Sequence, residues 1–259
     1  MEELKVLFLG IVQGLTEFLP VSSSGHIEIF KYFFNLTYLK NQGLLLTLVL
    51  HFATALSTIW VFRKEILKIL ENRTLKRNDF FFKVLFSMIP AVIIGLFFED
   101  SISALFNSNI LLVGIMLIIT SVLLYKTDKT NPKSKDISLR NAFFIGLIQA
   151  VAILPGISRS GATIALAVML GVNKTEAAKF SFLMVIPLIF GSIGKSVLFY
   201  SKNQTLNLSP LLVLGFLSAF LTGIIACKLM IKIVERSQLK YFGIYCFVVG
   251  FVIIIYGVI

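Results

Sequence analysis

The chain alternates long runs of apolar residues with short polar segments that are rich in lysine and arginine. Six of the apolar runs approach the length that a membrane-spanning helix needs, about 20 residues. Helices are the expected structure for such runs, because lipid offers no hydrogen-bond partner to an open backbone. The predicted spans cover residues 44–62, 84–98, 110–125, 180–198, 210–231 and 241–259.

Two further apolar regions, residues 4–30 and 141–173, are interrupted midway by proline, glycine and serine. Such interruptions inside a membrane are typical of broken or re-entrant helix pairs rather than of simple spans. We therefore predict an all-α integral membrane protein with six spanning helices and two broken helix pairs. Residues 1–259 are expected to form a single polytopic domain.

Lysine and arginine orient this arrangement in the membrane. Residues 63–83 carry seven of them, 126–140 carry five and 232–240 carry three, whereas 99–109 carry none. Loops rich in these residues face the cytoplasm, so the first three are placed inside and 99–109 outside. Counting the spans then makes the first broken pair enter from the outer face and the second from the cytoplasm.

The two halves of the chain therefore form an inverted-topology repeat. Residues 1–125 and 141–259 each hold one broken pair and three spans, and an odd number of spans reverses the orientation. The breaks of such a repeat meet inside the membrane, and we expect the functional site there. A shift of 136 positions supports the repeat by aligning Phe8 with Phe144, Gly10 with Gly146, Gln13 with Gln149, Ser22 with Ser158, Ser24 with Ser160, and Gly25 with Gly161.

Composition agrees with a membrane protein. Hydrophobic residues make up 57% of the 259 residues and charged residues 14%, against about 25% charged in soluble domains. Cytoplasmic loops explain the net charge of +11, so no nucleic-acid partner is expected. Cys227 and Cys246 are expected to pack as apolar side chains, and the acidic start at Glu2 and Glu3 predicts no cleaved signal peptide.

The first break carries a carboxylate at membrane depth. Gln13 and Glu17 are four residues apart and share one helix face. A charge in this position is costly and normally meets a partner or a polar cavity. Glu17 is thus either a structural ion pair with Arg159 or a group that faces a metal ion or handles protons. Together with the Gln13 amide it can supply part of the shell of Mg²⁺ or Ca²⁺.

Serines and a histidine follow this carboxylate at the start of the next half-helix. Ser22, Ser23 and Ser24 can be simple N-caps, or they can bind an anion together with the exposed N–H groups. His26 lies one turn further, where a serine hydroxyl could reach it. This arrangement leaves two alternatives open, a hydrogen-bonded structural histidine and a catalytic one.

The second break is rich in glycine and serine and carries Arg159. Backbone N–H groups, hydroxyls and a guanidinium all suit phosphate oxygens. His51 falls in the middle of a predicted span and is interpreted as a core histidine. The residues expected to bind a phosphate-bearing substrate are Ser22, Ser158, Arg159, Ser160 and Thr163.

These breaks resemble the two motifs of a known family. Residues 13–26, QGLTEFLPVSSSGH, are similar to the first motif of the undecaprenyl-diphosphatase family, the bacitracin-resistance phosphatases. Residues 155–163, PGISRSGAT, are similar to its second motif. The likeness continues through residues 176–183 and Pro187 and effectively covers the whole chain.

The resemblance implies a bacterial plasma-membrane hydrolase that removes one phosphate from undecaprenyl diphosphate. The product, undecaprenyl phosphate, carries peptidoglycan precursors. The resemblance also implies a divalent cation, Mg²⁺ or Ca²⁺, and an active site that opens to the outer face. Gln13 stands where the family admits Gln or Glu, and the other matching positions are Glu17, Ser23, His26, Ser158, Arg159 and Thr163.

The predicted mechanism has Ser23, activated by His26, attack the terminal phosphorus, with His26 itself as the alternative nucleophile. Glu17 and Gln13 are expected to hold the cation, while Arg159 leads the groups that bind the diphosphate. A transporter is the rival class, because inverted repeats with broken helices are typical of transporters. The sequence leaves open whether the protein forms a homodimer.

Overall fold

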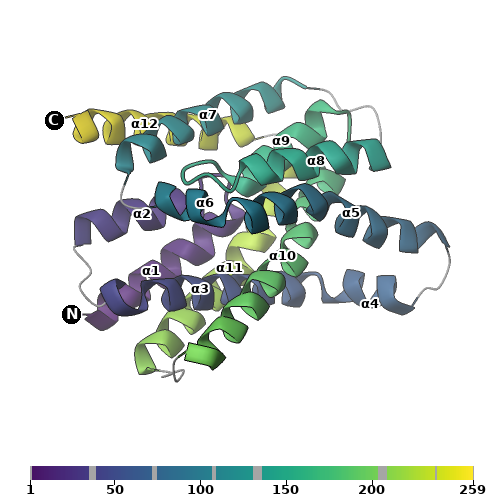
Figure 1. Cartoon of the computed structure of the whole chain (residues 1–259). Coiled ribbons are helices and arrows are strands. Elements are labelled where there is room, and N and C mark those ends of the chain that lie inside the picture. Colours follow the sequence, from purple (N-terminus) through teal and green to yellow (C-terminus); the bar gives the residue numbers. More distant parts are fainter. Residues whose placement is uncertain are drawn as a thin grey trace.

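The computed structural model describes residues 2–34, 39–71, 75–106, 109–130, 136–203, 209–236 and 238–258. Helices make up nearly all of this described part of the chain (Figure 1). Their bounds are α1 (Glu2–Phe18), α2 (Ser23–Phe34), α3 (Leu39–Val61), α4 (Arg63–Glu71), α5 (Leu75–Phe97), α6 (Glu99–Leu105), α7 (Ile110–Asp128), α8 (Leu139–Val151), α9 (Arg159–Met169), α10 (Lys174–Asn203), α11 (Pro210–Glu235) and α12 (Leu239–Val258).

Five of the described helices are long and apolar enough to cross a membrane. They are α5, α7, α10, α11 and α12, and each coincides with one of the predicted spans. The remaining predicted span, residues 44–62, lies in α3, whose apolar part Leu45–Val61 is 17 residues long. Many large apolar side chains on these helices point outward, as lipid-facing surfaces require. The protein is an α-helical multi-pass membrane protein.

Two predicted loops contain short helices instead. The segment 63–83 holds α4 and the start of α5, and the segment 99–109 holds α6. The hydropathy pattern missed both helices because each is too short and too polar to register as a span. Arg63 at the start of α4 lies over the Trp60 ring, 4.8 Å from its centroid, and this contact holds the turn between α3 and α4.

The two broken pairs are present where the sequence predicts them. α1 and α2 form the first pair, and α8 and α9 form the second. Proline disfavours the helical conformation at the residue before it, so α1 ends at Phe18 just ahead of Pro20, and α8 ends at Val151 ahead of Pro155. Four residues separate the first two helices and seven separate the second two.

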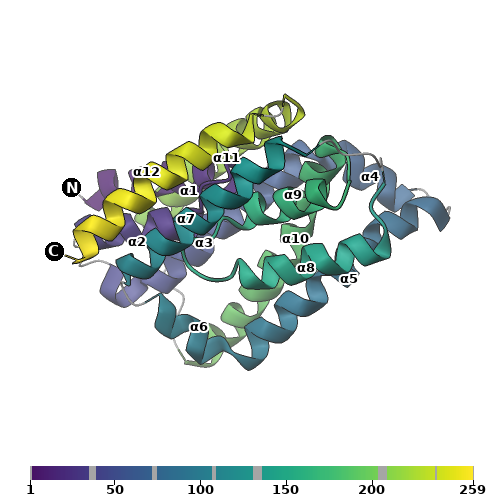
Figure 2. The same cartoon turned by 90° about the horizontal axis from the view of Figure 1, so that it is seen from above.

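The helices pack in a regular set of pairs. α7 lies along α12, α1 packs on α11, and α8 packs on α5, and the α7–α12 and α5–α8 pairs lie side by side in Figures 1 and 2. α3 contacts both α11 and α10, while α9 contacts α7, α8 and α10. The first halves of both broken pairs are thus held against long apolar helices of the opposite half of the chain.

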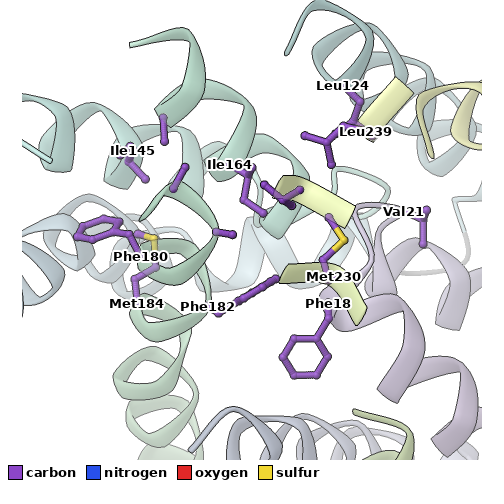
Figure 3. Close-up of a cluster of buried hydrophobic side chains, with 14 of the residues drawn as sticks. Phe18, Val21, Leu124, Ile145, Ile164, Phe180, Phe182, Met184, Met230 and Leu239 are labelled. Atoms are coloured by element: carbon purple, nitrogen blue, oxygen red, sulfur yellow. The ribbon is translucent and has the colours of Figure 1, made fainter. Parts of the chain in front are cut away.

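A large apolar cluster lies beside the two breaks. Figure 3 shows Phe18 at the end of α1 next to Phe182 of α10, with their ring centroids 5.6 Å apart. Ile164 of α9 and Met230 of α11 belong to the same cluster and are fully buried. Because this cluster fixes the end of α1 and the body of α9 together, it sets the distance between the polar residues of the two breaks.

Candidate active site

The first break contains an unfavourable backbone conformation at Ser22. Its φ is +71°, and it is the only non-glycine residue with positive φ in the described part of the chain. A side chain in this left-handed region is crowded by its own backbone. The Ser22 hydroxyl accepts a hydrogen bond from the Gly25 N–H at 3.2 Å, so it caps α2. The turn places Ser23 at the first position of that helix.

The second break also contains a left-handed residue, but it is a glycine two positions before the capping serine, and the capping serine itself is extended. Gly156 has φ +99°, and a Cβ there would lie 2.5 Å from the Val113 carbonyl oxygen, so only glycine fits. Ser158 caps α9, because its hydroxyl accepts the Gly161 N–H at 3.0 Å. Arg159 is then the first residue of α9, as Ser23 is of α2.

Glycines bring the two breaks into direct contact. A Cβ added to Gly25 would lie 3.0 Å from the Gly156 Cα, and one added to Gly161 would lie 3.0 Å from the Pro20 Cβ. The Ser160 hydroxyl also approaches the Phe18 carbonyl oxygen at 3.4 Å. The polar residues at the start of α2 and the start of α9 therefore form one site, as the predicted meeting of the breaks requires.

Glu17 is the centre of this site. Its Oε2 accepts a hydrogen bond from the Ser23 hydroxyl at 2.8 Å and one from Gln13 Nε2 at 3.0 Å. Its Oε1 pairs with the Arg159 guanidinium at 2.6 Å. The side chains of Glu17 and Arg159 are only 7% and 15% exposed. The nucleophile candidate and the phosphate-binding candidate thus bind opposite oxygens of one carboxylate.

Such a buried pair is tolerated only when hydrogen bonds satisfy its remaining polar atoms. The Arg159 guanidinium also donates to the Ser181 carbonyl oxygen on α10 at 2.9 Å. The structural ion pair that the sequence offered as one interpretation of Glu17 is therefore present. It does not exclude the functional interpretation, because a guanidinium has five N–H donors and these two bonds use two of them.

His51 of α3 adds a fourth group around the same carboxylate. Its Nε2 lies 3.9 Å from Glu17 Oε2. Its Nδ1 is 2.8 Å from the Thr47 carbonyl oxygen, which can only accept, so Nδ1 carries a proton. The interpretation of His51 as a core histidine is wrong, because the ring is partly exposed and faces the site.

His26 does not contact Ser23 in the way the sequence suggested. Its Nδ1 is 2.8 Å from the Ser22 carbonyl oxygen, and its Nε2 is 2.8 Å from the Tyr245 hydroxyl on α12. Ser23 hydrogen-bonds to Glu17 instead. The prediction that His26 activates Ser23 is therefore wrong in its geometry. Helical spacing alone could not reveal that the ring turns toward α12.

The other hydroxyls expected to bind substrate are mostly engaged within the protein. Ser22 and Ser158 act as helix caps, which was the simpler of the two alternatives for serines here. Ser160 is 3.4 Å from the Ser158 hydroxyl. Thr163 is fully buried and shares a 2.6 Å hydrogen bond with the Ser181 hydroxyl. The Ser158 N–H also donates within the protein, to the Thr120 hydroxyl at 3.1 Å, so Arg159 remains the part of this break best suited to an anion.

A hard cation could be held by Gln13 and Glu17. Gln13 is buried, and its Oε1 has no hydrogen-bond partner among the described residues. The assignment of Oε1 and Nε2 follows from the neighbouring carboxylate, which needs a donor. A carboxylate beside an unpaired amide oxygen is a donor set that Mg²⁺ and Ca²⁺ accept, with water and phosphate completing the shell. The two residues therefore fit the cation that the resemblance implies.

Comparison with known proteins identifies the family of this chain. Residues 6–252 match the model of the bacitracin resistance protein BacA family. The chain belongs to the BacA family. A protein of Christiangramia forsetii named undecaprenyl-diphosphatase is 52% identical over 261 residues, covering 99% of both chains. Proteins of the same name are 44% identical in Bacteroides fragilis, over 98% of both chains, and in Methanococcus vannielii, over 96% of this chain and 98% of the relative.

Three residues of the BacA-family site were not predicted as such from the sequence. Ser181 contributes its carbonyl to Arg159 and its hydroxyl to Thr163; it lies in the matching segment 176–183, but no pattern there indicated these contacts. Tyr245 lies in an apolar span and looks like an interfacial aromatic residue. His51 did carry a signal, because the chain has two histidines in all and a polar ring at membrane depth is costly without a partner.

Proposed function

We propose that this protein hydrolyses undecaprenyl diphosphate to undecaprenyl phosphate and inorganic phosphate. The observation that carries the proposal is the Glu17 carboxylate, which binds the Ser23 hydroxyl on one oxygen and Arg159 on the other. This arrangement pairs a nucleophile with its proton acceptor beside a phosphate-binding group. The names of the relatives, which match over nearly the whole chain, support the same substrate.

In the proposed first step the Ser23 Oγ bonds to the terminal phosphorus while its proton passes to Glu17 Oε2. The bond between that phosphorus and the bridging oxygen breaks, and undecaprenyl phosphate leaves. Water then attacks the phosphoserine and its displaced proton passes to a phosphate oxygen. The P–Oγ bond breaks, Glu17 returns the first proton to Ser23, and inorganic phosphate departs as H₂PO₄⁻. The 2.8 Å hydrogen bond between Ser23 and Glu17 supports this direction of proton transfer.

Arg159 is proposed to bind the diphosphate through the guanidinium N–H groups that it does not use on Glu17 and Ser181. Ser22, Ser158, Ser160 and Thr163 contribute less directly, by capping and fixing the two helix starts whose backbone N–H groups attract anions. Each has a hydrogen-bond contact within its own break, Ser22 with Ser24, Ser158 with Ser160, and Thr163 with the Arg159 carbonyl oxygen, and these contacts support the positioning role. His26 as nucleophile is the weaker alternative, because both of its ring nitrogens have partners.

Gln13 and Glu17 are proposed to hold the divalent cation, Mg²⁺ or Ca²⁺. When bound, the cation would offset the negative charge of the diphosphate and of the transition state. The unpaired Gln13 Oε1 is the feature of this chain that supports its presence.

The helix pairs support a six-span, inverted-topology arrangement for this fold. In the repeat, α1 is equivalent to α8, α3 to α10, and α5 to α11. The contact between α1 and α11 is then equivalent to the contact between α8 and α5, and both are present. In the same way, the contact between α3 and α11 is equivalent to the contact between α10 and α5. With the positive loops inside, the first break opens to the outer face of the plasma membrane.

A cysteine replacing Ser101 should then react with an impermeant maleimide in intact cells, and one replacing Lys129 should not; reversed labelling contradicts this orientation.

The activity is tested by phosphate release from a short-chain prenyl diphosphate by the purified protein in detergent, with and without a chelator. We expect release that the chelator abolishes and that added Mg²⁺ or Ca²⁺ restores. The broken helices meeting inside the bundle also suit a transporter. Movement of the lipid across liposome membranes with no phosphate released would contradict the hydrolase and support that rival.

A further inference from the structure

We propose that Tyr245 is a positioning residue for the phosphatase reaction. Its hydroxyl fixes the His26 ring, and the ring in turn holds the strained turn at Ser22 that presents Ser23 to Glu17. The role of this turn in catalysis rests on the function proposed above, whereas the chain of contacts itself does not. Nothing in the sequence motifs points to Tyr245, which lies 219 positions after His26.

The turn at Ser22 needs support from outside itself. A non-glycine residue with φ +71° is in an unfavourable conformation that persists only when its surroundings impose it. Two bonds to the Ser22 carbonyl oxygen provide that support, from the His26 backbone N–H at 3.1 Å and from the ring Nδ1 at 2.8 Å. Of these two bonds, the one from the ring depends on the orientation of the His26 side chain, which Tyr245 contacts.

The hydrogen bonds of His26 define which nitrogen carries the proton. A carbonyl oxygen only accepts, so Nδ1 must donate to Ser22. In the neutral ring Nε2 is then an acceptor, and the Tyr245 hydroxyl donates to it at 2.8 Å. The two rings are nearly parallel, at 9° and 5.7 Å between centroids. Since the His26 side chain is buried, removal of the hydroxyl leaves Nε2 without its donor and removes one of the two hydrogen bonds that hold the ring in place.

A second contact shows that α12 supports this break as a whole. Cys246, the residue after Tyr245, points its Sγ to the Pro20 carbonyl oxygen at 3.6 Å. Two consecutive residues of α12 therefore support this region from outside the first half of the chain, Cys246 at the break itself and Tyr245 at His26 in the first turn of α2. α12 is itself held along the length of α7, so the support is rigid.

The test is the Tyr245→Phe variant, which keeps the ring and removes only the hydroxyl. We expect kcat to fall by about tenfold with KM within about twofold of wild type, because the substrate-binding groups on α9 are untouched. Adding Ser22→Gly to this variant should recover part of the loss, since glycine adopts the left-handed conformation without external support and still caps a helix adequately. Tyr241→Phe, one turn earlier on the exposed face of α12, is the matched control and should behave as wild type.

Histidine NMR supplies a readout that does not depend on activity. The chain has two histidines, so ¹⁵N-labelled histidine gives two ring spectra, and His51→Gln assigns them. In wild type we expect His26 to be protonated at Nδ1 with Nε2 as acceptor, and in Tyr245→Phe we expect the Nε2 resonance to move toward that of an unbonded nitrogen. Wild-type protein with the proton on Nε2 alone overturns the proposal, and that measurement stands even if the variant does not fold.

Two further outcomes also overturn it. If Tyr245→Phe leaves the His26 spectrum unchanged, the hydroxyl does not fix the ring. If the spectrum changes while kcat stays at the wild-type value, the ring does not position Ser23. Absence of phosphate release from wild type is a separate result that contradicts the proposed function and leaves the contacts of Tyr245 to be judged from the spectra.

Discussion

The two breaks share a serine cap on the helix that follows but differ in backbone conformation and in three side chains that matter. Ser22 and Ser158 cap the helices that follow, and each lies 3.4 Å from the serine two positions later. The 136-residue shift places Arg159 opposite Ser23, so the first residue of each second half-helix reaches the same carboxylate. Glu17 and His26 correspond to Ile153 and Ala162, which carry no such group. The repeat therefore brings equivalent positions of the two breaks to one carboxylate, and the residues that differ between the breaks provide the groups proposed for catalysis.

The buried glutamines extend this comparison. Gln13 and Gln149 are equivalent under the same shift, and both are buried. Gln13 donates to Glu17, whereas neither amide atom of Gln149 has a hydrogen-bond partner among the described residues. A polar side chain is thus retained at both positions, but only the first has a carboxylate beside it. The comparison predicts that changes to the first break affect chemistry and that matched changes elsewhere do not.

The largest effect is expected from Glu17→Gln. The amide cannot take the proton of Ser23, and it can accept a hydrogen bond from Arg159 but cannot form an ion pair with it, so phosphate release should fall by about 10³-fold, roughly 4 kcal/mol of transition-state stabilisation. Glu28→Gln is the control, because Glu28 is equally buried on α2 but pairs with Lys31 at 2.9 Å. Equal losses in the two variants contradict a special role for Glu17.

A smaller effect is expected from Arg159→Lys. Lysine keeps the positive charge but has no planar pair of donors for two phosphate oxygens. The rate should fall by about tenfold, or about 1.4 kcal/mol, while Arg140→Lys on the exposed start of α8 should leave it unchanged. A normal rate in the Arg159→Lys variant, with normal thermal stability in detergent, means that the guanidinium does not contribute to binding the diphosphate.

The smallest effect, and the one that most directly compares the repeats, is expected from a pair of glutamine substitutions. Gln13→Glu adds a second carboxylate beside Glu17 and should lower the cation concentration for half-maximal rate by about threefold, since affinity follows ligand charge. Gln149→Glu should not lower it, because that position has no partner carboxylate. The same cation dependence in wild type and Gln13→Glu shows that residue 13 does not face the ion.

Sequence reasoning recovered the elements of this fold well. Hydropathy located the long helices because a span must be continuously apolar, and clustered proline, glycine and serine located the breaks because they disfavour helical backbone. It also brought Glu17 and Arg159 to one site, since the charge pattern of the loops implied that the breaks meet. These features depend on local sequence or on counting spans.

Contacts between distant elements could not be recovered in the same way. Whether the His26 ring faces Ser23 or Tyr245 depends on the rotation of α2 against α12, and an apolar pattern on α12 is compatible with many rotations. His51 reaches Glu17 because α3 packs against α1 and α11. The angle at which α3 crosses these two helices cannot be derived from the sequence. α4 and α6 were missed because short polar helices share their composition with loops.

The most direct test of the proposed mechanism is to trap the covalent intermediate. Wild-type protein mixed with a prenyl diphosphate labelled with ³²P in the terminal phosphate is quenched at neutral pH within milliseconds, digested, and analysed by mass spectrometry. The account predicts label on Ser23, lost in Ser23→Ala together with turnover and kept in the control Ser24→Ala. Label on His26, or full turnover by Ser23→Ala, contradicts it.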